Sequence, residues 1–162
     1  MIQAIIFNIS VTIAAFYLYH RIQYSETRTV TFSQNYITIL MTGVSILLIS
    51  NPIQYHDYAF SLSFIPILFL GRFTNLFYSV LSAVVIVLFD IFVMGTPFLD
   101  DIHLLIIAIV VGMIGPFLKQ SDFVSIQLLY LISIMIIAIT LIFLNPDSWL
   151  NEWLFLVPVS FI

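Results

Sequence analysis

The sequence has no cysteine among its 162 residues, and it carries very little charge. Without cysteine the chain has no disulfide framework, no thiol nucleophile and no thiolate metal site. Charged residues make up 7% of the chain, against about 25% in an ordinary globular domain. Eight acidic residues against four basic ones also argue against a nucleic-acid-binding surface. We therefore expect no nucleic-acid partner, no metal and no cofactor.

Apolar residues are what the sequence has in abundance. They make up 62% of the chain, and the mean hydropathy is +1.19. A soluble protein of this size cannot hide so much apolar surface, because small folded chains still expose a large share of their surface. The sequence therefore predicts a membrane protein whose main partner is the lipid bilayer.

Short polar breaks divide the chain into seven apolar segments. These segments are Ile2–Tyr19, Tyr36–Ile49, Tyr58–Gly71, Phe73–Gly95, Ile102–Leu118, Val124–Leu144 and Leu150–Ile162. A spanning helix needs about 20 residues. We predict a single all-α domain over residues 1–162, a polytopic helix bundle of six spans plus the start of a seventh. The second and third segments are short, so a re-entrant pair buried against protein is the alternative to two full spans.

The first segment could be mistaken for a secretion signal, but it lacks the basic region with which such signals begin. We interpret it as a retained membrane helix. The charged residues then orient the bundle. The odd-numbered connections hold all the basic residues, Arg21, Arg28, Arg72 and Lys119. The acidic residues of the even-numbered connections are Asp57, Asp100, Asp101 and Asp147. Because cytoplasmic loops collect Lys and Arg, we expect the four basic residues to be topology anchors. The N-terminus then lies outside, the acidic residues take the outer side, and the seventh segment heads into the cytoplasm.

Arg72 interrupts the apolar stretch "FIPILFLGRFTNLFYS". Gly71 precedes it and Asn75 follows closely, so the simplest interpretation is an anchor at a tight inner turn, where an arginine can snorkel to the interface. The sharper hypothesis is that Arg72 pairs with the ends of neighbouring helices and transmits their movement.

Other polar residues are candidates for sensing or packing. Asn8, Thr12 and Ala15 form one small, polar helix stripe, which predicts helix–helix packing or, alternatively, ligand contact. Asp90 lies near the outer end of the fourth segment, and we expect it to be a lipid-adjacent residue unless it is paired or binds a ligand. His103 and the nearby acidic residues are expected to be solvated loop positions, with cation binding or pH response as the alternative. No Ser–His–Asp arrangement, acid/base carboxylate pair or H-E-x-x-H helix is present, so we expect no enzyme activity.

Three stretches carry a resemblance to a known family: "FNISVTIAAFYLYHRIQYSE", "FIPILFLGRFTN" and "IGPFLKQSD". Together they resemble the membrane input module of the LytS–YhcK type, the five-transmembrane receptor family, and the likeness covers essentially the whole chain. The family name counts five helices, fewer than the six and a start expected here. The resemblance implies a bacterial cell-membrane sensor in signal transduction, placed ahead of a cytoplasmic output domain. A GGDEF domain is the output most strongly implied, followed by a histidine kinase linked to cell-wall and autolysis control.

No output-domain signature occurs in these 162 residues. We expect the chain to stop inside its seventh segment, ahead of such a domain, and we expect a homodimer to form through that domain. An unidentified small ligand is a further expected partner. The rival hypothesis is the substrate-binding membrane subunit of a vitamin-type importer. By family resemblance, such subunits dock their partner through an A-x-x-x-A pattern, and Ala4, Ala14 and Ala15 lack that spacing. A purely structural anchor is the third alternative.

Overall fold

The computed structural model describes residues 2–23, 30–55, 58–118 and 121–144. The elements in chain order are α1 (Ile2–Gln23), α2 (Val30–Ile49), β1 (Ile53–Tyr55), β2 (Tyr58–Phe60), α3 (Phe64–Phe73), α4 (Leu76–Phe89), the π-helix η1 (Asp90–Met94), α5 (Phe98–Ile114), the 3-10 helix η2 (Gly115–Phe117) and α6 (Asp122–Leu144). The predicted all-α membrane helix bundle is confirmed. A short antiparallel hairpin, β1 with β2, adds to it, and in this hairpin Ile53 lies opposite Phe60.

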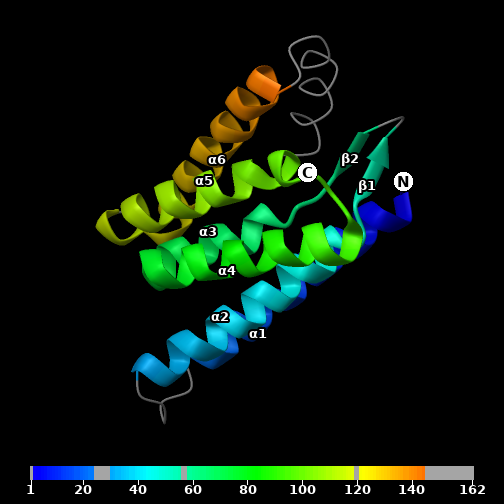
Figure 1. Cartoon of the computed structure of the whole chain (residues 1–162). Coiled ribbons are helices and arrows are strands. Elements are labelled where there is room, and N and C mark those ends of the chain that lie inside the picture. Colours follow the sequence, from blue (N-terminus) through cyan, green and yellow to red (C-terminus); the bar gives the residue numbers. More distant parts are fainter. Residues whose placement is uncertain (1, 24–29, 56–57, 119–120, 145–162) are drawn as a thin grey trace.

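The helices pack side by side across the bundle. Figure 1 shows α1 and α2 together along one edge and α6 at the opposite edge, with α3, α4 and α5 between them. The hairpin lies at the end of the bundle where α1 begins. The helices therefore run back and forth along the bundle, and turns and helix caps lie at both of its ends.

Four described helices are long and apolar enough to cross a membrane. They cover Ile2–Arg21, Leu76–Met94, Phe98–Phe117 and Asp122–Phe143. The predicted boundaries of the first and sixth segments agree closely with α1 and α6. Helix α2 begins at Val30 rather than at Tyr36, so it includes polar residues that precede the second predicted segment.

The third predicted span is wrong as a helix. Residues 58–60 form strand β2, and α3 has only ten residues. Ten helical residues measure about 15 Å, roughly half of the hydrocarbon thickness of about 30 Å. Pro66 lies in the first turn of α3, where its missing N–H costs no helix hydrogen bond, so the helix begins just before it. An extended entry and a half-length helix together replace the expected span.

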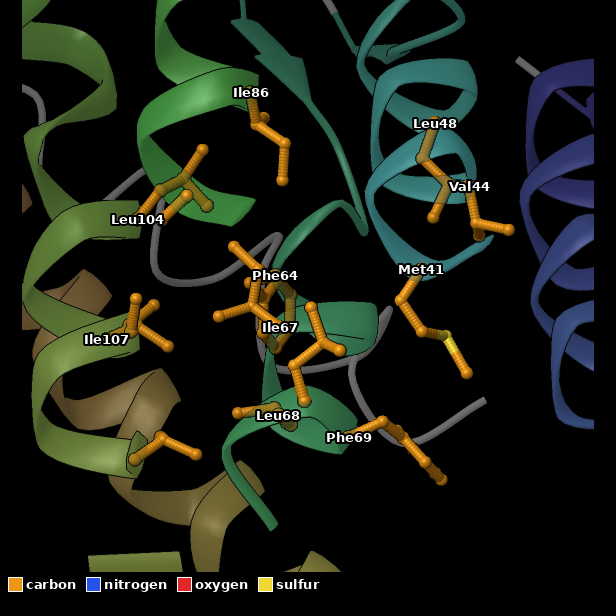
Figure 2. Packing of buried hydrophobic residues seen from close by; sticks show 14 of the residues in the cluster. Met41, Val44, Leu48, Phe64, Ile67, Leu68, Phe69, Ile86, Leu104 and Ile107 are labelled. Carbon is orange, nitrogen blue, oxygen red and sulfur yellow. The ribbon is translucent and has the colours of Figure 1, made fainter. Parts of the chain in front are cut away.

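Helix α3 lies at the centre of the hydrophobic core. Seven of its ten residues are buried, which suits a helix that is apolar on every side. Figure 2 shows Phe64 and Ile67 of α3 between Met41 of α2 and the pair Leu104 and Ile107 of α5. A helix packed on all sides transmits displacement to each neighbour, because protein interiors are close-packed.

Hydroxyl groups join the helices inside this core. Three interhelical contacts are Thr42 Oγ1 with Ser82 Oγ at 2.8 Å, Ser45 Oγ to the Ser63 carbonyl at 2.9 Å, and Ser79 Oγ to the Ala108 carbonyl at 3.1 Å. Small hydrogen-bonding residues are typical of helix contacts in membranes, because they allow close approach and find partners there. The outward faces are apolar instead, with Phe92, Phe117 and Phe143 each more than 80% exposed. These large apolar side chains fit lipid contact.

Candidate functional site

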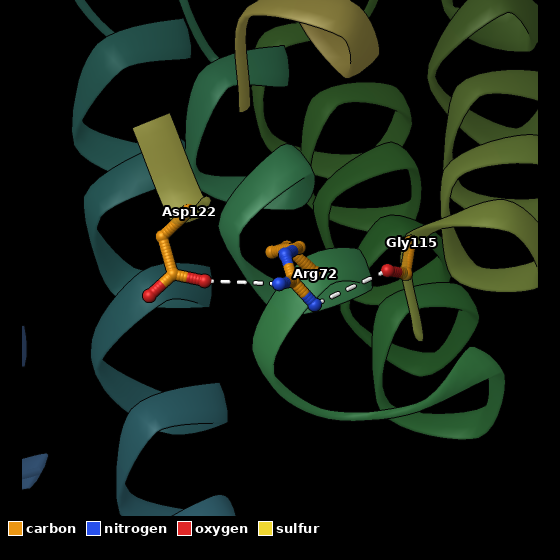
Figure 3. A network of polar contacts seen from close by, with 3 residues as sticks. All are labelled: Arg72, Gly115 and Asp122. Atoms are coloured by element: carbon orange, nitrogen blue, oxygen red, sulfur yellow. Dashed lines mark hydrogen bonds and ion pairs between the residues drawn. The ribbon is translucent and has the colours of Figure 1, made fainter. Parts of the chain in front are cut away.

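Arg72, the second-last residue of α3, joins three elements at one end of the bundle. Its Nη2 donates to Asp122 Oδ1 of α6 at 2.9 Å, and its Nη1 donates to the Gly115 carbonyl of η2 at 3.3 Å (Figure 3). The guanidinium also lies 5.6 Å from the ring centre of Phe73. The Arg72 side chain is 15% exposed and that of Asp122 is 66% exposed. We call these three residues, Arg72, Gly115 and Asp122, the arginine clamp.

Close backbone packing fixes the position of the arginine clamp. A Cβ on Gly115 would overlap the carbonyl group of Gly71, and a Cβ on Gly71 would overlap Val111. Only glycine allows α3 and η2 to approach this closely. The Gly115 carbonyl is held near Arg72 as a result, and α5 ends there because Pro116 cannot continue its hydrogen bonding.

Asn75 lies three residues beyond Arg72 and caps the next helix. Its Oδ1 accepts a hydrogen bond from the Tyr78 N–H at 3.2 Å, and its backbone is extended, as helix N-caps are. The hydroxyl of Tyr78 in turn donates to Asn35 Oδ1 of α2 at 2.8 Å. Asn75 therefore sets where α4 begins and which way the chain leaves the arginine clamp.

The two described basic residues, Arg21 and Arg72, lie at this same end. Tyr19, near the end of α1, has its ring centre 4.9 Å from that of Phe73, so Arg21 and Arg72 lie at one end of the bundle. Arg28 and Lys119 lie outside the described residues. Asp122, which is not among the acidic residues expected on the outer side, also lies at this end. That carboxylate lies at the basic end because Arg72 pairs with it.

Asp90 is buried at the opposite end of the bundle, which corrects its expected contact with lipid. Asp90 and Asp101 are each 6% exposed, and their carboxyl groups face each other within hydrogen-bonding reach. Thr96 lies between them. Its hydroxyl donates to Asp101 Oδ2 at 3.5 Å, and its N–H donates to the Asp90 carbonyl at 3.4 Å. We call Asp90 and Asp101 the carboxyl pair, and Thr96 is the threonine that bridges them.

The backbone around Asp90 is irregular. Residues 90–94 form a π-helix, a rare element found frequently at functional sites. Gly95 ends it in the left-handed region, with φ of 77°, and its N–H donates to the Asp90 carbonyl. Three backbone features thus converge on Asp90: the π-helix, the left-handed glycine and a carbonyl that accepts two N–H groups.

The prediction that His103 and its neighbours are loop residues is also wrong. Helix α5 begins at Phe98 rather than at Ile102, so Asp100, Asp101 and His103 are helical. The Nδ1 of His103 lies 2.7 Å from the Asp100 carbonyl one turn earlier. The first turn of α5 attracts acidic residues because the positive end of the helix dipole lies there. In the described part of the chain, no three His, Asp or Glu side chains gather as metal ligands.

Asn8 lies far from the arginine clamp and joins α1 to the end of α2. It is fully buried, and its Nδ2 donates to the carbonyls of Ala4 at 2.8 Å and Asn51 at 2.9 Å. Thr12 bonds back to the Asn8 carbonyl at 2.8 Å, and Ala15 is buried on the same stripe. These contacts favour the packing interpretation of this stripe.

A family model described as "5TMR of 5TMR-LYT" matches residues 16–156, which is most of the chain. The chain belongs to the five-transmembrane receptor family of the LytS type. This family is typically a sensor module. The predicted resemblance is therefore confirmed, and so is its implied location in the bacterial cell membrane as a multi-pass protein.

Curated relatives come from staphylococci. Proteins of Staphylococcus saprophyticus and Staphylococcus haemolyticus, each called an uncharacterized membrane protein, are 48% identical over 163 residues. A protein of Staphylococcus aureus with the same kind of name is 43% identical over 164 residues. All of this chain is covered, but only 46% of each relative. The chain thus spans a little less than half the length of these relatives. No solved structure matches it.

Sequence reasoning named Arg72 and Asp90 but missed their partners, Asp122 and Asp101. Asp101 could have been found by extending the core stripe of the fifth segment backwards. Leu104, Ala108 and Val111 are buried at spacings of three and four residues, and the next position toward the N-terminus is Asp101. Asp122 has no comparable signal, because its contact with Arg72 spans fifty positions.

Proposed function

We propose that this family member is the membrane input module of a bacterial signal-transduction protein, which senses a stimulus and relays it to a cytoplasmic output domain. Membership of a receptor family that is typically a sensor module supports this proposal. The observation that carries it in the structure is the arginine clamp. One guanidinium connects the end of the buried helix α3 to η2 and to the beginning of α6.

The arginine clamp suits relay for a physical reason. Helix α3 is packed against α2, α4, α5 and α6, so a rearrangement in the core moves the end of α3. Arg72 then gains or loses its contacts with Gly115 and Asp122, which biases the position of α6. A stimulus can shift such an equilibrium only by its different affinity for the two arrangements. The arginine clamp is the element whose two states would differ.

A GGDEF domain is the output we favour, followed by a histidine kinase of cell-wall and autolysis control. The length of the curated relatives supports room for a further domain in those proteins, since this chain covers only 46% of them. A dimer formed through the output domain and a small ligand as stimulus complete the proposal. Orientation follows from positive charge, with the end that holds Arg21 and Arg72 in the cytoplasm.

The test joins residues 1–162 to a GGDEF output domain and measures cyclic di-GMP in cells that lack other cyclases. Arg72→Ala should change the cyclic di-GMP level several-fold at an unchanged amount of membrane-inserted protein. The matched control is Arg21→Ala, which removes an exposed basic residue from the same end of the bundle. Equal output from both variants and the parent would contradict relay through Arg72. Uptake of a vitamin by residues 1–162 in proteoliposomes would favour the importer subunit instead.

A further inference from the structure

Asp90 and Asp101 are the outermost members of two buried stripes that face each other. On α4 and η1 the stripe is Ser79, Ala83, Ile86 and Asp90, and on α5 it is Asp101, Leu104, Ala108 and Val111. Spacings of three and four residues place such positions on one helix face. Because α4 packs along α5, both carboxyl groups point into the helix interface and away from lipid.

The described surroundings of the carboxyl pair offer no cation. Asp100 lies beside it on α5 and adds negative charge, and His103 lies one turn further along the same helix. Among the described side chains of the neighbouring helices, the ionisable groups are Tyr36 of α2, Arg72 of α3, Tyr78 of α4, and Asp122 and Tyr130 of α6. Most of these ionisable groups lie at the end of the bundle that holds Arg72, and Tyr130 lies in the middle of α6. The carboxyl pair therefore has no described counter-ion.

Hydrogen-bond donors are equally scarce. An ionised carboxylate only accepts hydrogen bonds. Thr96 supplies one hydroxyl donor to Asp101, while the Asp90 carboxyl has no partner among the described residues other than Asp101. Buried polar groups are almost always hydrogen-bonded, so an acceptor facing an acceptor here is incomplete without a hydrogen between them.

We propose that Asp90 and Asp101 form a proton-binding pair, which holds one proton between the two buried carboxyl groups. With the proton bound, one carboxyl donates its O–H to the other, and the pair carries a single negative charge. Loss of the proton to water leaves two negative charges in contact, and they repel each other inside the bundle. This proposal does not depend on the sensor role.

The helix geometry gives this repulsion a direction. At the other end of the same two helices, a Cβ on Gly112 would press against the backbone of Leu76, so α4 and α5 are locked together there. At the end of the bundle that holds Asp90 and Asp101, the chain has a π-helix and a left-handed glycine, which are irregular elements that can adjust. Loss of the proton therefore separates the outer ends of α4 and α5 while their inner ends stay in contact.

Infrared spectroscopy of the chain in lipid nanodiscs tests the pair directly. The difference spectrum between about pH 5 and pH 9, a window above the range in which ordinary carboxyl groups titrate, should show the loss of one protonated carboxyl band. Asp90→Asn and Asp101→Asn should each abolish this band, because the amide N–H₂ replaces the proton as the donor to the remaining carboxylate. Asp100→Asn is the matched control, since that side chain is exposed, and it should keep the band.

Two outcomes would overturn the proposal. One is a parent spectrum without a protonated carboxyl band in this window, which needs no variant to fold. The other is a band that persists in both Asp90→Asn and Asp101→Asn, or that disappears in Asp100→Asn. A second readout follows the geometry through spin labels at the exposed positions Val93 and Leu99. Their dipolar broadening should weaken as the pH rises in the parent chain and stay constant in Asp90→Asn.

Discussion

The guanidinium of Arg72 lies 2.9 Å from the carboxylate of Asp122, although fifty positions separate the two residues. All of α4 and α5 lie between the two residues in the sequence, so the contact forms only when α3 and α6 are correctly placed relative to each other. Asp122 is 66% exposed, which means that water screens the pair strongly. An exposed ion pair contributes about 1 kcal/mol or less to stability. Its small contribution suits a contact that breaks and forms during signalling.

Gly71 and Gly115 should matter far more for stability than the ion pair does. Gly115→Ala forces a methyl group onto the carbonyl of Gly71, with no flexible side chain to yield. Overpacking of this kind costs about 1–3 kcal/mol or more. We expect a clear fall in the thermal unfolding temperature of Gly115→Ala in nanodiscs.

Gly43→Ala is the matched control for this substitution. Gly43 lies inside α2, and a Cβ there would have nothing within 4 Å. Alanine is favoured over glycine in helices by about 1 kcal/mol, so this variant should unfold at the same temperature or higher. If both variants behaved alike, close approach of α3 and η2 would not be what fixes the arginine clamp.

Membrane orientation can be measured cleanly because the chain has no cysteine of its own. Arg21→Cys and Asp100→Cys place single thiols at exposed positions on opposite ends of the bundle. A membrane-impermeant maleimide added to intact cells should label position 100 and leave position 21 unlabelled until the cells are opened. Labelling of both positions from outside would contradict the orientation expected from positive charge.

Asn8 provides a test of the packing stripe on α1. Asn8→Ala removes the donor to the Asn51 carbonyl and leaves a small gap where the amide was buried. Losing a buried hydrogen bond of this kind costs about 1–3 kcal/mol, so the unfolding temperature should fall. Gln3→Ala, at an exposed position of the same helix, should leave it unchanged. A well-folded Asn8→Ala variant with altered output would instead favour ligand contact.

Composition and segment length were sufficient to predict the bundle. The first and sixth segments became α1 and α6 with small changes at their ends, because a long apolar run in lipid must satisfy its backbone as a helix. The third segment shows the limit of this reasoning. Hydropathy cannot distinguish an apolar strand from an apolar helix, so it predicts a span over residues 58–60, which in fact form strand β2 and pair with β1.

The candidate site was only half predictable, for a different reason. Arg72 stands out as a charge in an apolar run, but its partner is chosen by the way α3 and α6 pack. The sequence pattern predicts a loop at Asp101, because the hydrophobic run begins after it. The helix in fact begins at Phe98, behind Pro97, whose fixed backbone angle suits the turn that leads into a helix. Contacts across the bundle depend on tertiary packing, and no single segment contains that information.

Catalysis by this chain alone is not expected. A nucleophile, an acid/base pair or a phosphate cradle requires a recognisable set of side chains, and sequence reasoning finds none. We predict that purified residues 1–162 neither synthesise nor hydrolyse nucleotides and do not phosphorylate themselves. Incubation with labelled GTP and ATP checks this, and product formation above that of empty nanodiscs would contradict it.

We propose that the signal passes through the contact between Arg72 and Asp122. A double-mutant cycle on output tests it most directly, with Arg72→Ala, Asp122→Ala and the double variant each joined to the same GGDEF domain. Because Asp122→Ala has no contact left to remove once Arg72 is gone, the double variant should change cyclic di-GMP synthesis by the same factor as Arg72→Ala alone. Independent factors that multiply in the double variant, or no change in any of the three, would contradict the account.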